Sequence, residues 1–474
     1  MQRGGADTLV CPMPDKSVRP TDVLQVGCRD LLTLGPAAGR SEKMNSSEAI
    51  QKAVLKSVAE ARATDVHTHL YAPNFGLLEW GIDDLLTYHY LVAEAMRWLD
   101  LPYERFWRLS KQQQADLVWQ TLFIDHSPYS EACRGVLTAL QHLGLDTSSR
   151  SLADYRAFFG QQKLEDHLDR VFELAGLESV VMTNDPFDDL ERRAWLDKQK
   201  RDPRFHAALR LDALLNSWET ALRRLKAWGY NVDEGFAGPT CREVQRFLEE
   251  WIERTRALYM AVSLPPSFAF PEESPRSRLI EECVLPVAQS RKIPLALMIG
   301  VRRSVNPGLR LAGDSVGRAS VEAVEHLCAN HPDNKFLATM LARENQHELC
   351  VAARKFRNLM IFGCWWFLNV PSLVEETSRM RFELLGGSVI PQHSDARVLE
   401  QLVYKWAHSR AIIGRLLAEK YNDLAATGWP VSEAEIRRDV ADLFSGNFWS
   451  FLGHPFRNRK QNLAQPGHPE PVEG

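Results

Sequence analysis

The stretch Asp65-Val66-His67-Thr68-His69-Leu70 places two histidines two residues apart at the end of a short apolar run. On a β-strand, residues i and i+2 point to the same face, so His67 and His69 would aim their imidazoles at one point. Paired imidazoles suit a divalent metal of the zinc class. The alternative is a strand with two incidental histidines, because His-x-His alone is a weak motif.

A second apolar run lies near the other end of the chain and ends in a carboxylate. It reads Ser388-Val389-Ile390-Pro391-Gln392-His393-Ser394-Asp395. If the strands form a barrel that closes on itself, the first and last strands become neighbours. The sequence therefore predicts that Asp395 lies beside His67 and His69.

Size and composition restrict the function classes. The chain has 474 residues, of which 45% are hydrophobic and 25% charged, with a formal net charge of −4. Nucleic acid is not an expected partner, because the sequence lacks a long basic block. No apolar run reaches the roughly 18 residues of a membrane helix, and no secretory signal is evident, so no membrane is expected either. The eight scattered cysteines favour reduced thiols and a cytoplasmic location.

Short apolar runs alternate with amphipathic helical segments along most of the chain, which is typical of parallel βαβ units. Eight such runs predict an α/β fold of the (β/α)₈ TIM-barrel type, with a long helical insertion over 71–178 between the first two strands. An open doubly wound sheet is the alternative, but no strand is followed by Gly-x-Gly-x-x-Gly. Residues 1–45 and 456–474 are predicted to be disordered tails around a barrel domain at 46–455. The eight runs are 64–69, 179–184, 206–212, 259–264, 293–301, 335–341, 359–366 and 387–395.

Polar and aromatic groups gather where the predicted strands end, and this is where barrel enzymes place their chemistry. Arginine forks bind carboxylates, and aromatic rings pack against sugar faces, so the set suggests a small polyhydroxylated anion as ligand. Taken singly, each arginine could be a surface ion-pair residue, each tryptophan a core residue and Asp185 a helix cap. The groups are Asn184, Asp185, Arg210, Arg302, Arg303, Arg343, Trp365, Trp366, Asn369, His393, Asp395 and Arg397.

These residues carry a family likeness. The sequence resembles the uronate isomerases (glucuronate isomerase) of the amidohydrolase superfamily, in the family's order from about residue 65 to 450. The double-Trp strand followed by Asp-x-Arg is fairly specific, whereas His-x-His is shared by the whole superfamily. The matching pieces are Asp65–Leu70, Ala95–Arg97, Val181–Asp189, Leu341–Asn345, Gly363–Phe367 and Ser394–Arg397.

The resemblance implies one divalent metal, with Zn²⁺ expected, and His67, His69 and Asp395 as its ligands. It implies interconversion of D-glucuronate with D-fructuronate, or of D-galacturonate with D-tagaturonate. It further implies a homo-oligomer that acts on a small sugar acid. Asp395, Arg397 and Tyr90, the last favoured over Tyr88, would be catalytic. The residues expected to bind substrate are Arg210, Arg343, Trp366, Asn369, Asn184 and Asp185.

One position departs from the family. Many uronate isomerases have a histidine where this chain has Met298, and a thioether is a poor ligand for a hard or borderline ion. Either the chain belongs to a branch that manages without this histidine, or its activity has drifted. The stretch Tyr88-His89-Tyr90 favours a divergent branch that keeps the isomerase activity.

Two other readings compete with an isomerase. A mononuclear metal-dependent hydrolase of the same superfamily, such as a lactonase or deaminase, would use the same three ligands. A binuclear hydrolase is disfavoured, because the fourth run has no lysine and the fifth and sixth have no histidine. A barrel that only binds a sugar acid is disfavoured because the His-His-Asp set is intact.

Overall fold

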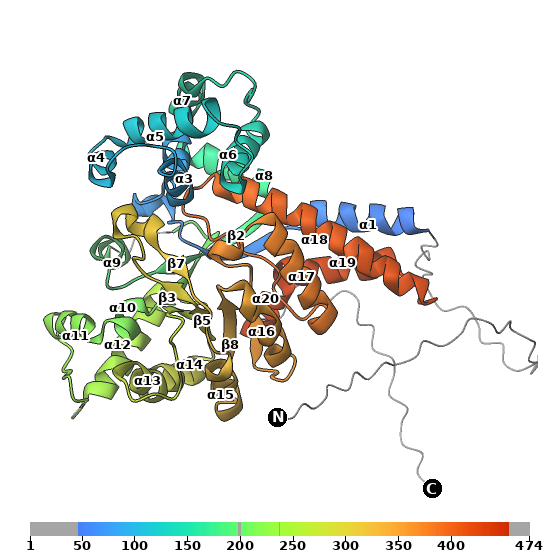
Figure 1. The fold of residues 1–474 in the computed structure, drawn as a ribbon. Helices are drawn as coiled ribbons and strands as arrows, with labels where there is room; N and C mark the ends of the chain where they lie inside the picture. Colours follow the sequence, from blue (N-terminus) through green and yellow to red (C-terminus); the bar gives the residue numbers. More distant parts are fainter. Residues whose placement is uncertain (1–45, 198–200, 237, 455–474) are drawn as a thin grey trace, which may run out of the picture. The chain divides into compact units, whose positions relative to one another are not determined.

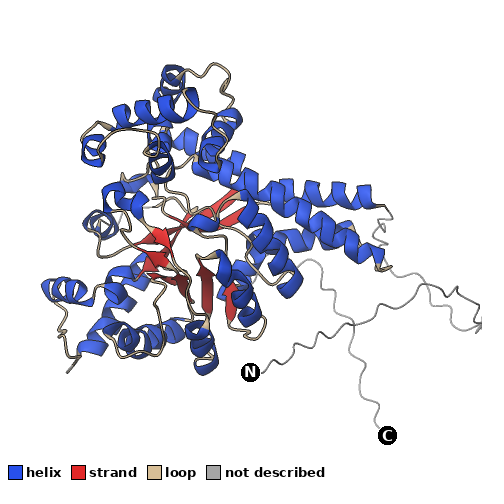
Figure 2. Ribbon diagram, in the orientation of Figure 1, coloured by secondary structure: helices blue, strands red, loops and turns tan. Residues whose placement is uncertain are grey.

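Seven parallel strands form a curled sheet around which the other elements pack (Figures 1 and 2). The structure is a computed structural model that describes residues 46–197, 201–236 and 238–454. The predicted tails 1–45 and 456–474 lie outside the described residues. The strands, in sheet order, are β1 (Ala63–Thr68), β2 (Leu177–Asn184), β3 (Phe205–Arg210), β4 (Met260–Leu264), β5 (Leu295–Ile299), β8 (Phe336–Met340) and β9 (Leu359–Ile361).

The strands are buried on both faces, which explains their nearly continuous apolar sequences. In β5, Leu295, Leu297 and Ile299 belong to the large core under the helices. Ala296 and Met298, the residues between them, belong to a smaller cluster within the curl of the sheet. This alternation follows from the two-residue repeat of a strand and places Met298 on the inner face.

The eighth predicted strand, 387–395, is not regular. It pairs with β9 only through a bridge between Phe362 and Ile390, and the Ile390 N–H donates to Ile361 O over 3.0 Å. At its far end, the Asp395 N–H donates to His67 O over 3.1 Å. The segment thus bonds to both outer strands of the sheet. It departs from strand geometry because Pro391 has no N–H to donate and Asp395 has a φ of 55°.

The chain between β1 and β2 is helical and has its own hydrophobic core. Figure 1 shows α4–α7 gathered apart from the sheet, whereas α8 ends at Gly176 and leads directly into β2. The helices are η1 (Pro73–Phe75), α2 (Ile82–Leu86), α3 (His89–Ala95), α4 (Tyr103–Trp107), α5 (Lys111–Trp119), η2 (Gln120–Ile124), α6 (Glu131–His142), α7 (Leu152–Gly160) and α8 (Leu164–Ala175).

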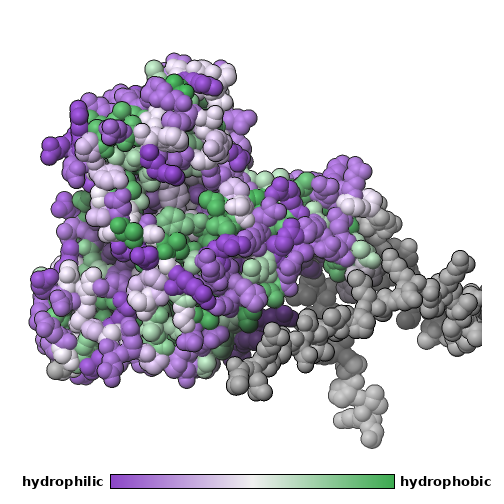
Figure 3. All heavy atoms as spheres, in the orientation of Figure 1, coloured by the Kyte–Doolittle hydropathy of each residue, from purple (hydrophilic) through white to green (hydrophobic). Residues whose placement is uncertain are grey.

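The remaining helices follow the later strands, together with a short antiparallel pair, β6 (Val301–Arg302) and β7 (Ser315–Val316). No helix among the described residues combines the length and apolarity needed to span a membrane. The face shown in Figure 3 is largely hydrophilic, with smaller hydrophobic patches. These helices are α9 (Asp189–Leu196), α10 (Asp212–Asn216), α11 (Trp218–Ala227), α12 (Thr240–Thr255), α13 (Pro275–Leu279), η3 (Ile280–Val284), α14 (Leu285–Arg291), η4 (Pro307–Gly313), α15 (Glu322–Asn330), η5 (Arg343–Asn345), α16 (Gln346–Ala353), η6 (Trp366–Leu368), α17 (Pro371–Leu385), η7 (Asp442–Gly446) and α20 (Asn447–Leu452).

Three helices from the two ends of the described chain pack side by side. They are α1 (Ser47–Glu60), α18 (Gln401–Ala426) and α19 (Glu433–Ala441), and Figure 1 shows them running together away from the sheet. The amino end of α18 reaches back to the edge where β1 meets the segment bearing Asp395, because the Trp406 indole N–H donates to Asp65 on β1 over 2.8 Å.

The double tryptophan is not on a strand, contrary to the predicted run 359–366. β9 ends at Ile361, and Trp366 opens the short helix η6 with a φ of 46°. The left-handed backbone at Trp366 lets Trp365 and Trp366 both reach the cavity described below, whereas an alternating strand would have separated them.

Gly363 should be irreplaceable where the chain leaves β9. Its φ is 67°, and a Cβ there would lie 1.9 Å from Cδ2 of the buried His393. Left-handed strain costs about 1–3 kcal/mol, and overpacking adds about 1–3 kcal/mol. Gly363→Ala should therefore lower the free energy of unfolding, measured by urea denaturation, clearly more than Gly386→Ala. Gly386 is the matched control, because it has a φ of 60° but open space around its Cβ. Equal losses in the two variants would contradict the packing argument.

Candidate metal centre and active site

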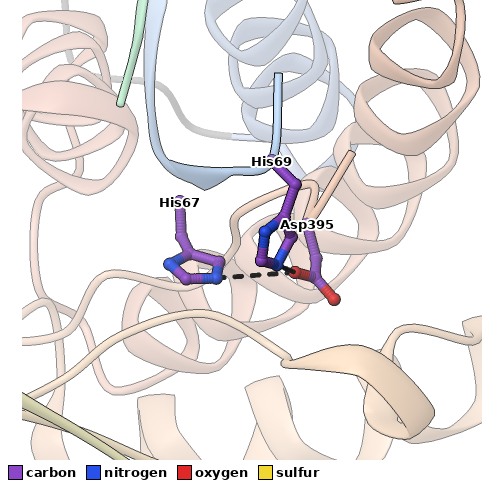
Figure 4. Close-up of side chains that lie close together, drawn as sticks. All are labelled: His67, His69 and Asp395. Carbon is purple, nitrogen blue, oxygen red and sulfur yellow. Dashed lines mark ion pairs between the residues drawn. The ribbon is translucent and has the colours of Figure 1, made fainter. Parts of the chain in front are cut away.

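His67, His69 and Asp395 meet at the edge where β1 adjoins the segment that ends in Asp395 (Figure 4). The distance from His67 Nε2 to Asp395 Oδ1 is 3.5 Å, and the distance from His69 Nε2 to the same oxygen is 3.3 Å. His67 is 2% exposed and Asp395 is 9% exposed. The structure thus brings together the three predicted metal ligands.

The donor atoms are suited to a metal ion. Two ligands at about 2.0–2.1 Å from a tetrahedral zinc would lie about 3.3 Å apart, close to the two distances above. His67 Nε2 and Asp395 Oδ1 are buried, and neither has a hydrogen-bond partner among the described residues. Unpartnered buried polar atoms are costly, and a cation between them would remove that cost. Three protein ligands leave a fourth position open, as catalytic zinc sites do.

A hydrogen bond from a neighbouring strand sets the tautomer of His69. The Thr183 hydroxyl, at the end of β2, donates its single proton to Thr68 O over 3.0 Å. It must therefore accept the 3.1 Å bond from His69 Nδ1, which carries the ring proton. The lone pair of His69 then lies on Nε2, the atom that faces Asp395.

The charges around the cluster favour the ligand form of each group. Burial and the Arg397 guanidinium lower the pKa of His69 to about 3, so the imidazole is neutral. Burial opposes ionisation of Asp395, but the neighbouring His67 and His69 side chains outweigh it and lower the pKa of Asp395 well below its usual value. A neutral imidazole beside an ionised carboxylate is what a divalent cation requires.

The backbone around Asp395 is held from two sides. The Asp65 carboxylate accepts from the Ser394 N–H over 3.0 Å. On the other side, the Asn369 amide donates to Ser394 O over 3.1 Å and to His393 O over 3.3 Å. These bonds fix a segment whose left-handed residue, Asp395, belongs to the candidate metal cluster.

A narrow polar cavity opens onto the cluster. Arg397 points its charge into this cavity, and no carboxylate of the described residues lies within ion-pair distance of its guanidinium. Two further arginines share Asp212, with Arg210 at 3.0 Å and Arg303 at 3.7 Å. The lining residues are His67, His69, His89, Thr183, Arg210, Asp212, Ala261, Val262, Ser263, Met298, Arg303, Trp365, Trp366, Asp395 and Arg397.

Four residues predicted to bind substrate do not line this cavity. The Arg343 side chain is 59% exposed and bonds Glu376 over 3.0 Å, because η5 turns it away from the strand end. Asn369 lies under the Asp395 segment, where its amide bonds to backbone. Asn184 and Asp185 bond instead to Glu191, Asn184 through its side chain and Asp185 through its backbone N–H.

Tyr90 lies beside a neighbouring cavity, which also has Asn369, His89 and Trp366 in its wall. His89 and Trp366 are common to both cavities and separate them. Burial raises the pKa of Tyr90 well above its usual value, so Tyr90 carries its proton at neutral pH. Tyr88 lies next to it, with ring centroids 5.0 Å apart.

The structure adds residues to the site that the candidate set omits. Thr183 directly precedes the predicted residue Asn184, and His89 directly precedes the predicted residue Tyr90. The motifs therefore indicated the right segments, but each prediction named the neighbouring residue. Arg303 follows the fifth predicted strand, but nothing local distinguishes it from Arg302. Met298 lines the cavity at the position where the family likeness leads one to expect histidine.

Comparisons with known proteins agree with this geometry. The crystal structure of a uronate isomerase from Bacillus halodurans C-125 is 58% identical, with a TM-score of 0.86, and the match covers 88% of this chain and 99% of that chain. A uronate isomerase from Thermotoga maritima (15% identity, TM-score 0.67, 87% and 100% covered) and a glucuronate isomerase from Caulobacter crescentus (15%, 0.70, 90% and 98%) share the fold. No protein-family model and no curated protein sequence matches the chain.

Thr183→Val should weaken metal binding without unfolding the protein. The substitution keeps the shape but removes the acceptor that orients His69, and such partners are typically worth 10–100-fold in metal affinity. Affinity should be measured by competition with a chelator. Thr339→Val is the matched control, because Thr339 is a buried threonine on β8 whose hydroxyl has no partner and does not line the cavity. Unchanged affinity in Thr183→Val would remove Thr183 from the site.

Proposed function

The chain belongs to the uronate isomerase family, and from this premise we propose that it interconverts aldose and ketose sugar acids. The substrate pairs would be D-glucuronate with D-fructuronate, or D-galacturonate with D-tagaturonate. The observation that carries the proposal is the 58% identity over 99% of the Bacillus halodurans uronate isomerase, together with the His67–His69–Asp395 cluster in the cavity.

The reaction moves one proton between neighbouring carbons. The open-chain aldehyde loses the proton on the carbon next to the carbonyl, gives an enediol, and regains a proton one carbon over. One carbon is oxidised as its neighbour is reduced, so no redox cofactor is needed. A single divalent ion, of which Zn²⁺ suits two imidazoles and a carboxylate best, would stabilise negative charge on the substrate oxygens.

The side chains in the cavity have complementary roles. Asp395 is ionised and lines the cavity, so it can accept a proton from substrate. The unpaired Arg397 guanidinium would stabilise the oxyanion that develops beside it. Tyr90, protonated, is the proposed partner in proton transfer, and it would act from the neighbouring cavity across His89.

The substrate's carboxylate needs an anchor at a distance from the reacting carbons. Arg210 lines the cavity and is held in place by Asp212, which bonds to its Nε and Nη2, so its remaining N–H groups could bind the carboxylate, with Arg303 also beside Asp212. Trp366 supplies an aromatic wall to the same space. We assign Arg343 no contact with substrate, and Asn369, Asn184 and Asp185 a role in supporting the loops around the site.

Further parts of the proposal concern the whole molecule. The segment ending in Asp395 bonds to both β9 and β1, which supports a closed barrel of eight members with the helices over 71–178 as an insertion. We also propose that the protein acts in the cytoplasm as a homo-oligomer on free sugar acids, without nucleic acid or membrane partners.

The direct test is proton NMR of the metal-loaded protein with D-glucuronate and with D-galacturonate in deuterated water. Conversion to the ketouronates is expected, and the two rates would rank the substrates. Deuterium at the receiving carbon would support proton transfer that exchanges with solvent. Absence of both ketouronates with metal bound would overturn the proposal in favour of a mononuclear hydrolase, since that reaction uses the same three ligands.

Two substitutions test the assigned roles. His67→Ala should abolish turnover and reduce bound metal while the protein still folds, whereas His347→Ala, which replaces an exposed histidine on α16, should change neither.

Arg397→Lys should lose about 10²-fold or more in kcat, because lysine lacks the planar fork that stabilises the developing charge. Arg343→Lys is its control and should keep full activity. A normal rate in Arg397→Lys would show that the guanidinium geometry is not used.

A further inference from the structure

The neighbouring cavity is a chemically equipped space in its own right. It has a volume of about 310 Å³ and lies between α3, the start of α6, η6 and α18. His89 and Trp366 belong to the walls of both this cavity and the metal cavity, so the two cavities adjoin. A ligand in one cavity would therefore lie one side-chain thickness from a ligand in the other.

Lys405 is a buried cation in the wall of this cavity with little to bond to. It is 5% exposed, and among the described residues its ammonium group donates only to Asn369 O, over a long 3.4 Å. The ammonium group otherwise lies 5.3 Å from the ring centroid of Tyr404 and 5.8 Å from that of Tyr90. No carboxylate of the described residues lies within ion-pair distance of it. An ammonium group has three protons to donate, and burying it with so few partners is costly. Burial accordingly lowers the pKa of Lys405 to about 8.

Glu131, from the first turn of α6, is an acceptor in the same wall. One of its oxygens takes a 2.6 Å hydrogen bond from His408 Nδ1. The other is buried without a hydrogen-bond partner, and its closest cation is Arg134 at 3.8 Å. The cavity thus offers a spare donor and a spare acceptor. An anion would satisfy Lys405 but be repelled by Glu131, and a cation would suffer the reverse, whereas a hydroxyl group both accepts and donates.

The remaining wall is aromatic. Trp366 and Phe367 stack with ring centroids 5.0 Å apart, and Phe367 stacks with Tyr90 at 6.3 Å. Flat aromatic surfaces next to a few polar groups are typical of sites that hold a ring with an apolar face and a hydroxylated rim.

We propose that this cavity is a second sugar subsite, which holds a hydroxylated pyranose ring between Lys405, Glu131 and the Trp366–Phe367–Tyr90 wall. The inference deepens the proposed function, because the subsite adjoins the cavity where the sugar acid would react. The ring can be supplied in two ways. It is either the neutral non-reducing unit of a disaccharide whose reducing uronate lies at the metal, or a separate neutral sugar molecule.

Two probes distinguish these sources on the metal-loaded wild-type protein. Isomerisation of a disaccharide with D-galactose linked α-1,4 to a reducing D-galacturonate, followed by proton NMR, would show the linked arrangement. Saturation transfer from the protein to methyl β-D-glucopyranoside, measured after the protein has equilibrated with D-galacturonate, would show the separate one. The methyl glycoside has neither a free aldehyde nor a carboxylate, so it does not compete for the reaction. Turnover of D-galacturonate alone tests the proposed function independently.

Ala93→Phe is the decisive variant, because Ala93 lies in the cavity wall on α3 and a phenyl group there would fill the space. It should lower kcat/KM for the disaccharide, or the saturation-transfer signal, at least about tenfold more than it lowers kcat/KM for D-galacturonate, whose turnover also uses the nearby Tyr90. Lys405→Met should weaken the same readouts, whereas Lys335→Met should not. Lys335 also donates to a backbone carbonyl, that of Phe451, but lies outside the cavity.

Two results would overturn the subsite. One is the absence of both disaccharide turnover and saturation transfer in an enzyme that converts D-galacturonate, which would mean that the cavity holds only water. The other is either signal persisting undiminished in Ala93→Phe. If Lys405→Met fails to fold, Ala93→Phe carries the test by itself.

Discussion

The buried carboxylate of Asp65 is the link on which the site depends. It accepts hydrogen bonds from the Ser394 N–H and from the Trp406 indole, and Asp65 and Ser394 lie 329 residues apart in the chain. A fully buried carboxylate is stable only when its oxygens are bonded, so the three segments must meet here. That meeting brings a ligand-bearing loop against a ligand-bearing strand. Without the hydrogen bonds to Asp65, little would hold Asp395 beside His67.

The cluster is arranged for a cation before any cation is bound. Burial and Arg397 keep His69 neutral, and Thr183 directs its free lone pair towards Asp395. The lining arginines divide by their partners: Asp212 restrains Arg210, whereas Arg397 has no carboxylate within ion-pair distance in the part of the chain that the structure describes. A guanidinium held in place, like that of Arg210, suits the binding of the substrate's carboxylate. A guanidinium without a bound carboxylate, like that of Arg397, suits the stabilisation of negative charge that develops during the reaction. The division of roles follows from which arginine already has a carboxylate beside it.

The backbone departs from regular geometry where the chemistry gathers. Asp395 and Trp366 both have positive φ, Pro391 interrupts the eighth segment, and β9 is only three residues long. Each irregularity costs free energy, and the bonds from Asp65, Asn369 and Gly363 hold the strained segments in place. Local rules of strand and side-chain alternation fail at these positions because a site needs several side chains to converge, whereas a regular strand sends neighbours to opposite faces.

The sequence by itself determined the parallel α/β architecture, the helical stretch after the first strand and the three residues of the candidate metal cluster. These features rest on short-range regularities: apolar runs of strand length, helical periodicity, and a histidine pair whose spacing fits one face of a strand. The first seven predicted strands therefore overlap the observed ones, although 359–366 is too long. Such patterns predict where each strand ends, and the carboxyl ends of parallel strands lie at the same edge of the sheet, where the site forms.

Only the tertiary structure decided which side chains at that edge face the cavity. Arg343 and Arg303 both follow a strand, yet the first turns outward to Glu376 and the second lines the cavity. The Asn369 amide donates to backbone carbonyls and does not line the cavity. His89 and Thr183 line the cavity, whereas their neighbours Tyr90 and Asn184, which the sequence predicted there, do not. The physical reason is that a side chain's direction beyond a strand end depends on the path of the loop. That path is set by hydrogen bonds to residues far away in the chain, such as those made by Asp65.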